Sequence, residues 1–165
     1  MIAEQVNPAL KEVSIQLLED AAKYGYNMFL RKSTVAPAIF FVKNGRFGHV
    51  IVADLSEDTK DNVATFIHEI RKSTDCTVFI GEVWAHFEKL PKGLTDDAFR
   101  RHVDAIPQPS EMPDREEGVM LLVYEGERKI IFLNKISRNP DALGEFKLSE
   151  DSSATGTRLS GRFIS

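Results

Sequence analysis

The sequence predicts an α+β domain in which helices pack on a largely antiparallel sheet of about five strands. Two hairpin signals and two amphipathic segments carry this prediction, in the order helix, hairpin, helix, strand and hairpin. Consecutive hairpins favour antiparallel pairing. The chain has 165 residues, of which 42% are hydrophobic and 28% charged, and this is ordinary usage for one globular domain with a single core.

A first helix is expected from Asn7 and Pro8 to Gly25. Asn caps free backbone N–H groups, and Pro is tolerated at the first helical position, where its missing N–H is not needed. Apolar residues then recur at the spacing of one helix face: Leu10, Val13, Leu17, Leu18 and Ala21. Gly25 favours termination, because glycine readily adopts the left-handed conformation found at helix ends.

The clearest local signal is a hairpin formed by residues 38–43 and 46–54. Both segments are rich in Ile, Val and Phe. The Asn44-Gly45 pair between them accepts the positive φ angles of a two-residue turn. The sequence therefore predicts two paired strands here.

A second helix is expected from about Glu57 to Lys72. Ser56 stands where an N-cap belongs, and the acidic side chain of Glu57 complements the positive end of a helix. The expected buried stripe comprises Val63, Phe66, Ile67 and Ile70.

The segment Thr77–Phe87 is expected to be a central strand. Its apolar residues fall on both alternating faces, which fits a strand covered on one side and partly on the other. A second hairpin is expected from residues 119–124 and 129–136, which flank a polar turn with Gly at residues 125–128. One buried sheet is then expected to hold Phe40, Ile51, Ile80 and Ile131.

The prolines and glycine within residues 91–113 predict a long excursion over the surface, with a short helix between Asp96 and Val103. The single domain is expected to span residues 1–148. Residues 149–165 form a tail rich in Ser, Thr, Gly and Ala that carries Phe163 near its end. We expect this apolar tip to dock on its own domain or on a second subunit.

Charge and composition exclude several classes of protein. The formal net charge of −4 weighs against a protein that mainly neutralises nucleic-acid phosphates. No apolar run approaches the ~18 residues of a membrane span, and the N-terminus lacks the pattern of a secretory signal. We therefore expect a cytoplasmic protein without a membrane partner. The single cysteine, Cys76, is expected to be a packed side chain rather than a nucleophile.

The most unusual local string, residues 81–88, gives the expected central strand one polar face. Glu82, Trp84 and His86 share a face, since alternate residues of a strand point to the same side. Glu82 and His86 are separated by roughly 13 Å of backbone rise, so they make no metal site alone. If the following proline loop folds back, Asp114 and Glu116 would join them as oxygen ligands and a general base. These four residues are the catalytic candidates of a metal-assisted hydrolase.

Short signatures of cofactor or metal binding are missing from the sequence. There is no glycine-rich phosphate loop, no paired-cysteine knuckle, no His-Glu-x-x-His helix and no Gly-x-Ser-x-Gly elbow. The sequence therefore predicts no cofactor and no dedicated metal site.

Residues 109–117 read Pro-Ser-Glu-Met-Pro-Asp-Arg-Glu-Glu and lead into the strand at Val119. The two prolines restrict this loop, and Arg115 can pair with a carboxylate of a neighbouring segment. With Glu82-Val83-Trp84, the loop resembles a family of uncharacterised bacterial and phage-associated proteins, in which a strand ends in Glu-Ala-Trp and a loop reads Pro-Ser-Glu-His-Pro-Asp-Arg-Glu-Glu. The resemblance covers about a third of the chain and departs at Met112, where the family has His. It implies no activity, and any role of that His would be lost in this chain.

Three functions remain open. The leading one is a non-enzymatic interaction or regulatory domain that self-associates as a homo-oligomer, with Trp84, Arg115 and Phe163 as candidate binding residues. The metal-assisted hydrolase is the alternative. A nucleic-acid-associated module is the third, prompted by Arg100-Arg101-His102 and by two arginines of the tail. Those clusters are small and lack interleaved aromatic residues, so nucleic acid is not the favoured partner.

Overall fold

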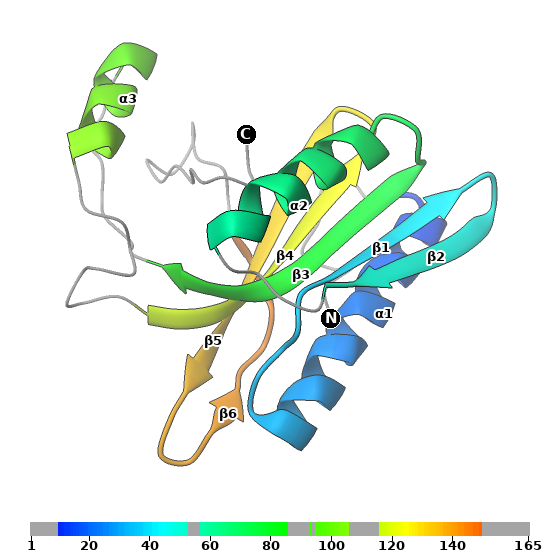
Figure 1. Ribbon diagram of the computed structural model, residues 1–165, viewed down its shortest axis with the longest axis horizontal. Coiled ribbons are helices and arrows are strands. Elements are labelled where there is room, and N and C mark those ends of the chain that lie inside the picture. The colour runs from blue at the N-terminus through cyan, green and yellow to red at the C-terminus, as the bar shows by residue number, and fades with distance from the viewer. Residues whose placement is uncertain (1–9, 53–56, 86–92, 94, 106–115, 150–165) are drawn as a thin grey trace.

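A seven-stranded antiparallel sheet with a helix on each face forms the body of the protein (Figure 1). The computed structural model describes residues 10–52, 57–85, 93, 95–105 and 116–149. The helices are α1 (Glu12–Lys32), α2 (Glu57–Ile70) and α3 (Asp96–Ala105). The strands are β1 (Ala38–Lys43), β2 (Arg46–Ile51), β3 (Cys76–Ala85), β4 (Glu116–Glu125), β5 (Arg128–Ser137), β6 (Ala142–Leu143) and β7 (Lys147–Ser149).

The strand order is β2-β1-β3-β4-β5-β6, and β7 pairs with β5 beside β6. Every pairing between these strands is antiparallel. The expected α+β class is therefore confirmed, although the sheet has more strands than the expected five. The two extra strands, β6 and β7, have two and three residues, too few for a periodic pattern to predict them.

The helix α1 covers one face of the sheet, chiefly over β1, β3 and β4. It begins at Glu12, because Leu10 and Lys11 are not helical. The expected start at Asn7 is therefore wrong, and Asn7 itself lies outside the described residues. The apolar side chains of α1 and of the strands beneath it form the larger core, which includes Leu17, Leu18, Phe29, Val78, Ile80, Val119, Leu121 and Phe132.

The expected end of α1 at Gly25 is also wrong, because the helix continues to Lys32. Ser33 then adopts the left-handed conformation, and its N–H donates to the carbonyl of Phe29 at 2.8 Å. Gly25 is buried within the helix, where an added Cβ would lie 2.7 Å from Cδ1 of Ile80. Glycine thus permits close approach of the helix to β3 instead of ending the helix.

The helix α2 covers the opposite face of the sheet (Figure 1). Ala64 and Ile67 are buried, at 6% and 0% exposed, whereas Phe66 is 43% exposed. The expected stripe is therefore wrong at Phe66, which lies about 100° around the helix from Ile67. The second core beneath α2 comprises Ile39, Ile67, Phe79, Met120, Leu122, Tyr124 and Ile131.

The strands β3 and β4 lie at the centre of the sheet, and residues 77–85 of β3 pair with residues 116–124 of β4. The expected central strand is confirmed over Thr77 to Ala85, and Phe87 lies outside the described residues. Strand β4 is buried without interruption from Gly118 to Tyr124. Because alternate side chains face α1 and α2, a continuously buried strand requires cover on both faces.

Both predicted hairpins are confirmed. Asn44 and Gly45 have φ angles of 51° and 74°, as a two-residue turn between β1 and β2 requires. The turn of the second hairpin is Gly126-Glu127, and Arg128 already belongs to β5. The boundary of the tail, expected at residue 149, falls inside β7. Residues 150–165, including Phe163, lie outside the described part of the chain.

Strand β2 departs from the expectation of a shared buried sheet. It ends at Ile51, short of residue 54, which lies outside the described residues. Ile51 is 55% exposed, whereas Ile80 and Ile131 are buried. These two belong to different cores, on opposite faces of the sheet. The four residues named from the sequence thus lie in one sheet but not in one buried surface.

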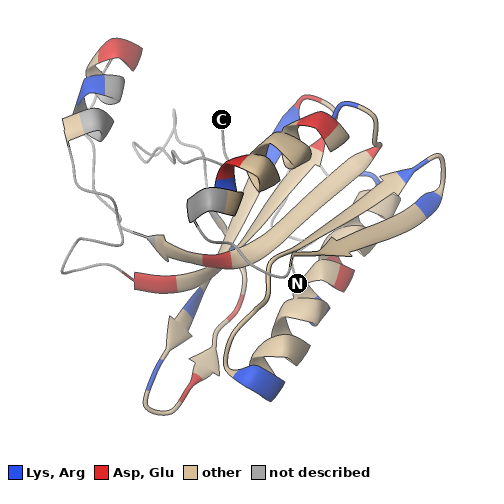
Figure 2. Cartoon of the chain, viewed as in Figure 1, with Lys and Arg blue, Asp and Glu red and all other residues tan. Residues whose placement is uncertain are grey.

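Charged residues lie mainly on the helices and near the turns and strand ends, and they are sparse in the strand interiors (Figure 2). The short helix expected within the excursion is α3, whose N–H at Ala98 donates to Oγ1 of Thr95 at 3.1 Å. Within the described ranges, the structure contains no helix with the length and apolar content that crossing a bilayer requires.

Candidate functional site

Glu82 and Trp84 lie near the end of β3 on the face that α1 covers. Glu82 is opposite Val119, which is buried beneath α1, and Trp84 is opposite Glu117. Directly opposed residues share a face, so the side chains of Glu82, Trp84 and Glu117 project to the same side. The shared face of Glu82 and Trp84, predicted from alternation, agrees with this register.

The carboxylate of Glu82 holds the segment between α1 and β1. Its Oε1 accepts a hydrogen bond of 2.7 Å from the backbone N–H of Val35, a residue that is only 2% exposed. A buried N–H without an acceptor is costly, so this contact fixes the path of residues 33–37 against β3. Within the described structure, Glu82 therefore acts as a structural acceptor.

Glu82→Ala is expected to lower the free energy of unfolding by about 1–3 kcal/mol, because the N–H of Val35 would stay buried without its acceptor. Glu82→Gln keeps an acceptor oxygen and is expected to cost less than half as much. Urea unfolding followed by circular dichroism measures both. Equal losses in the two variants would mean that the negative charge, and not the hydrogen bond, is what matters.

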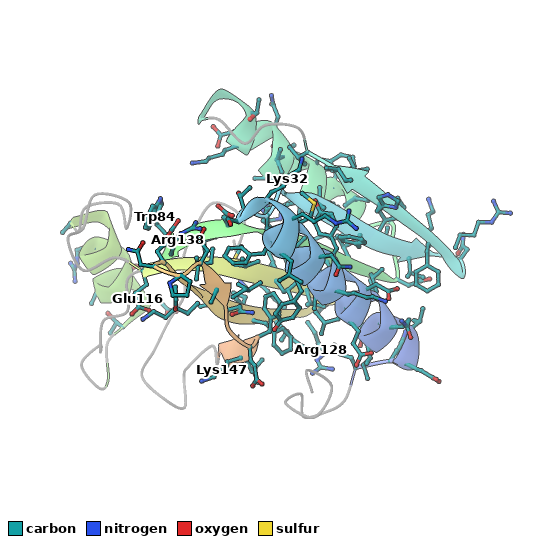
Figure 3. All side chains as sticks on the ribbon, turned by 90° about the horizontal axis from the view of Figure 1, so that it is seen from below. Lys32, Trp84, Glu116, Arg128, Arg138 and Lys147 are labelled. Atoms are coloured by element: carbon teal, nitrogen blue, oxygen red, sulfur yellow. The ribbon has the colours of Figure 1, made fainter. Side chains whose placement is uncertain are left out.

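A second cluster lies beside Glu82 and was not anticipated from the sequence. Arg138 donates to both carboxylate oxygens of Glu117, from Nε at 2.9 Å and from Nη2 at 3.0 Å. Its Nη1 also donates to the carbonyl of Ser33 at 3.0 Å and lies 3.3 Å from Asp141. The arginine therefore ties together the end of α1, the start of β4 and the turn after β5. Trp84, Arg138 and Glu116 all lie toward this end of the sheet (Figure 3).

The bidentate contact changes the acidity of Glu117. The hydrogen bond from Arg138 is the largest cause, and it holds the pKa of Glu117 below its ordinary value. The same contact raises the pKa of Arg138. Both groups are thus fully charged and fully engaged at neutral pH, which is the behaviour of a clamp and not of a proton-transfer pair.

Glu116 projects to the opposite side of the sheet from Glu82. It is opposite Ala85, three residues before Val119, so alternation turns it toward the face of α2. Its Oε1 lies 3.0 Å from Nζ of Lys135 in an exposed ion pair. The structure therefore does not bring Glu82 and Glu116 together.

The other named candidates, His86, Asp114, Arg115 and Phe163, lie outside the described residues, so the four-residue hydrolase set stays a prediction. In the part of the chain that the structure describes, no three His, Cys, Asp or Glu side chains are grouped so as to hold a metal ion. Arg101 is exposed on α3, and the side chains of its neighbours Arg100 and His102 are not described.

A groove of about 350 Å³ lies at the end of β3, β4 and β5. Val83, Gly118 and Leu133 form part of its apolar lining, and Lys135 and Lys147 also line it. Its described lining has no Ser, Cys or His that could act as a nucleophile or neutral base. Buried Asn134 borders it, and its Nδ2 donates to the carbonyl of Gly144 at 2.7 Å.

The outer edge of β2 is the third candidate site. Phe47 and Ile51 are 57% and 55% exposed, and Val50 is 41% exposed, so three large apolar side chains face solvent on one short strand. No described segment pairs with this edge, because β2 is the first strand of the sheet order. The strand is regular, with each residue opposite one residue of β1.

Hydrogen bonding to β1 decides which backbone groups of β2 face outward. The N–H of Val52 donates to the carbonyl of Pro37 at 2.8 Å, so these two residues form a hydrogen-bonded pair. Such pairs alternate along an antiparallel ladder, so the backbone groups of Val50 and Gly48 also point to β1. Those of residues 47, 49 and 51 consequently point to the open edge.

The side chains of Phe47, His49 and Ile51 share the face of α1, opposite residues of β1 that pack beneath that helix. The His49 ring stacks on Phe40 with centroids 5.9 Å apart, and Phe40 in turn meets Tyr24 edge-on at 5.5 Å. The open edge is therefore backed by an ordered row of rings. The alternation of β2 was visible in the sequence, but its place at the edge depends on the sheet order.

The described residues thus offer three candidate sites: the hydrogen-bonded contacts of Glu82 and Arg138, the groove beside Gly118, and the edge of β2. The resemblance of residues 109–117 to uncharacterised bacterial and phage-associated proteins stays a prediction. No protein-family model matches the chain, and no significant match is found among curated proteins or solved structures.

Proposed function

We propose that this chain is a non-enzymatic interaction domain that joins another polypeptide by extending its sheet at β2. The observation that carries the proposal is the open edge of β2, where outward backbone groups lie beside the exposed side chains of Phe47 and Ile51. An incoming extended segment gains main-chain hydrogen bonds at such an edge, and its alternate side chains supply specificity.

The composition of β2 supports pairing. Soluble proteins protect an exposed edge with charged residues, proline or bulges, because a bare edge recruits other strands. From Phe47 to Ile51 the strand has no Lys, Arg, Asp, Glu or Pro, and its register with β1 contains no bulge. Such an edge promotes aggregation of a domain that acts alone, whereas in an interaction domain it can bind a partner strand.

The described carboxylates support a binding role over catalysis. Glu82 is engaged by a buried N–H, Glu117 by Arg138 and Glu116 by Lys135. The contacts of Glu82 and Glu117 hold neighbouring segments of the fold together, the pair of Glu116 and Lys135 is exposed, and Glu82 and Glu116 face opposite sides of the sheet. No described contact favours the hydrolase or the nucleic-acid alternative.

A strand-mimicking peptide tests the proposal. A synthetic peptide with the sequence of residues 46–52 is titrated into dilute, isotopically labelled protein, and backbone amide shifts are recorded by NMR. We expect the largest shifts at Phe47, His49 and Ile51, with a Kd of roughly 0.1–1 mM for so short an edge. The matched control is the same peptide N-methylated at these three positions, which keeps the side chains but cannot donate. Equal shifts from both peptides, or none up to several millimolar, would refute edge pairing.

A further inference from the structure

We infer that the strand received at β2 is the β2 strand of a second copy, paired antiparallel across a two-fold axis at His49. This inference rests on the proposed function and names the partner for the same edge. It follows from the backbone pattern, from both faces of the strand and from the distribution of charge.

The backbone pattern selects one register. Only residues 47, 49 and 51 of β2 turn their N–H and C=O groups outward. With the axis at His49, Phe47 pairs with the partner's Ile51, His49 with the partner's His49, and Ile51 with the partner's Phe47. Every outward group of β2 then lies in a hydrogen-bonded pair. A shift of two residues would move one pair into the Gly45 turn or beyond the end of the strand.

The face of α1 gains two apolar contacts in this register. Phe47 is set directly against the partner's Ile51, and the symmetry repeats the contact. Aromatic and β-branched residues form favourable cross-strand pairs, and these two are the most exposed apolar side chains of β2. Between them, the two His49 rings face each other at the axis.

The opposite face gains a matching contact. Val50 lies opposite the partner's Gly48, in a pair without hydrogen bonds, where the chains approach most closely. The ring of Phe41 lies across β2 at Gly48, where an added Cβ would overlap it. Val50 therefore meets the partner's Phe41 with no side chain between them. One register thus covers all three exposed apolar side chains of β2.

Charge and helix placement are compatible with this arrangement. Arg46 lies opposite the partner's Val52, so the two Arg46 residues are about 20 Å apart, beyond a Debye length of about 8 Å. The helix α1 packs chiefly on β1, β3 and β4, and β2 is the outermost of the described strands on its side of the sheet (Figure 1). The two α1 helices would be separated by roughly five strand spacings, or about 24 Å, which leaves them clear of each other.

The edge is short, so the dimer is expected to be weak. Sedimentation velocity of the full chain from about 5 µM to 1 mM should show a concentration-dependent dimer with a Kd on the order of 100 µM. Phe47→Asp removes both symmetric contacts and should raise this Kd by up to about 30-fold, at up to about fivefold per contact. The matched control is Leu30→Asp, at a residue of α1 that is 83% exposed, which should leave the Kd within about twofold.

Amide hydrogen exchange supplies a residue-level readout of the register. The amides of Phe47, His49 and Ile51 should gain protection as the concentration rises through the Kd. Those of Gly48 and Val50 already bond to β1 and should be protected at every concentration. Circular dichroism of each variant confirms that it folds.

A chain ending at Ser149 distinguishes edge pairing from docking of the tail. A dimer that is lost on this truncation but unaffected by Phe47→Asp would overturn the inference, as would protection confined to other strands. A chain that stays monomeric at 1 mM would also overturn it. In that case, binding of the β2 peptide would leave the proposed interaction role standing, and failure of the peptide would reject both.

Discussion

Leu121→Ala and Leu122→Ala are each expected to lower the free energy of unfolding by about 2–5 kcal/mol. These neighbours on β4 are both fully buried, yet their side chains point to opposite faces of the sheet. Leu121 belongs to the core beneath α1 and Leu122 to the core beneath α2. Truncation of either removes buried methyl groups and leaves a cavity that the surrounding core fills only in part.

The comparison between the two variants tests the architecture itself. Chemical denaturation at constant pH gives both values, and Leu30→Ala, at an 83% exposed leucine, should change stability by no more than about 0.5 kcal/mol. If Leu122→Ala were as mild as this control while Leu121→Ala was severe, α2 would not cover the second face. A sheet covered only by α1 would then replace the three-layer arrangement.

Local signals in the sequence predicted the parts of the fold that are decided locally. The turn at Asn44-Gly45 has positive φ angles at both positions, which these two residues readily adopt, and no distant contact is needed to form it. Gly25 shows the opposite case, because glycine is typical of helix ends, but here it permits contact with Ile80 of β3. The structural role of a glycine depends on what packs against it, and the neighbouring sequence does not reveal that contact.

For the candidate site, the sequence could predict which side chains of one strand share a face, but not their contacts with other strands. Alternation placed Glu82 and Trp84 on one face, and the register agrees. The opposite orientation of Glu116 depends on how β4 pairs with β3, and the partner of Glu117 is Arg138, 21 residues away. Contacts of this kind leave no short motif, since loops of many lengths can close them at similar cost.

The exposure of Ile51 has the same origin. Ile51 lies in a segment with the composition of a buried strand, and the sequence therefore predicted burial. Among the described strands, β2 pairs only with β1, and α1 packs chiefly on β1, β3 and β4, so Ile51 stays exposed. An edge strand with the apolar composition of an interior strand is expected where another strand completes the sheet.

The thiol of Cys76 is expected to be alkylated at pH 8 at least about 100-fold more slowly in the folded protein than in the unfolded chain. Cys76 is 1% exposed, and burial raises its pKa from 9.0 to about 11. Since the thiolate is the reactive form, this rise in pKa alone reduces the thiolate fraction at pH 8 about 100-fold. Mass spectrometry after timed iodoacetamide treatment, with and without urea, measures the ratio.

The same shift makes the folded state sensitive to alkali. Because the folded pKa is raised, the contribution of the neutral thiol is fully present below pH 9, and it is lost as the pH rises toward about 11. Over that window the loss should reach about 2–3 kcal/mol. Cys76→Ala should lack this component. The raised pKa values of Tyr24, Tyr26 and Tyr124 act in both chains, so they cancel in the difference. Two results would contradict this account: parallel stability curves for wild type and variant from pH 8 to 11, or rapid alkylation without urea. Either would show that solvent reaches Cys76. The start of β3 would then open far more readily than a central strand should.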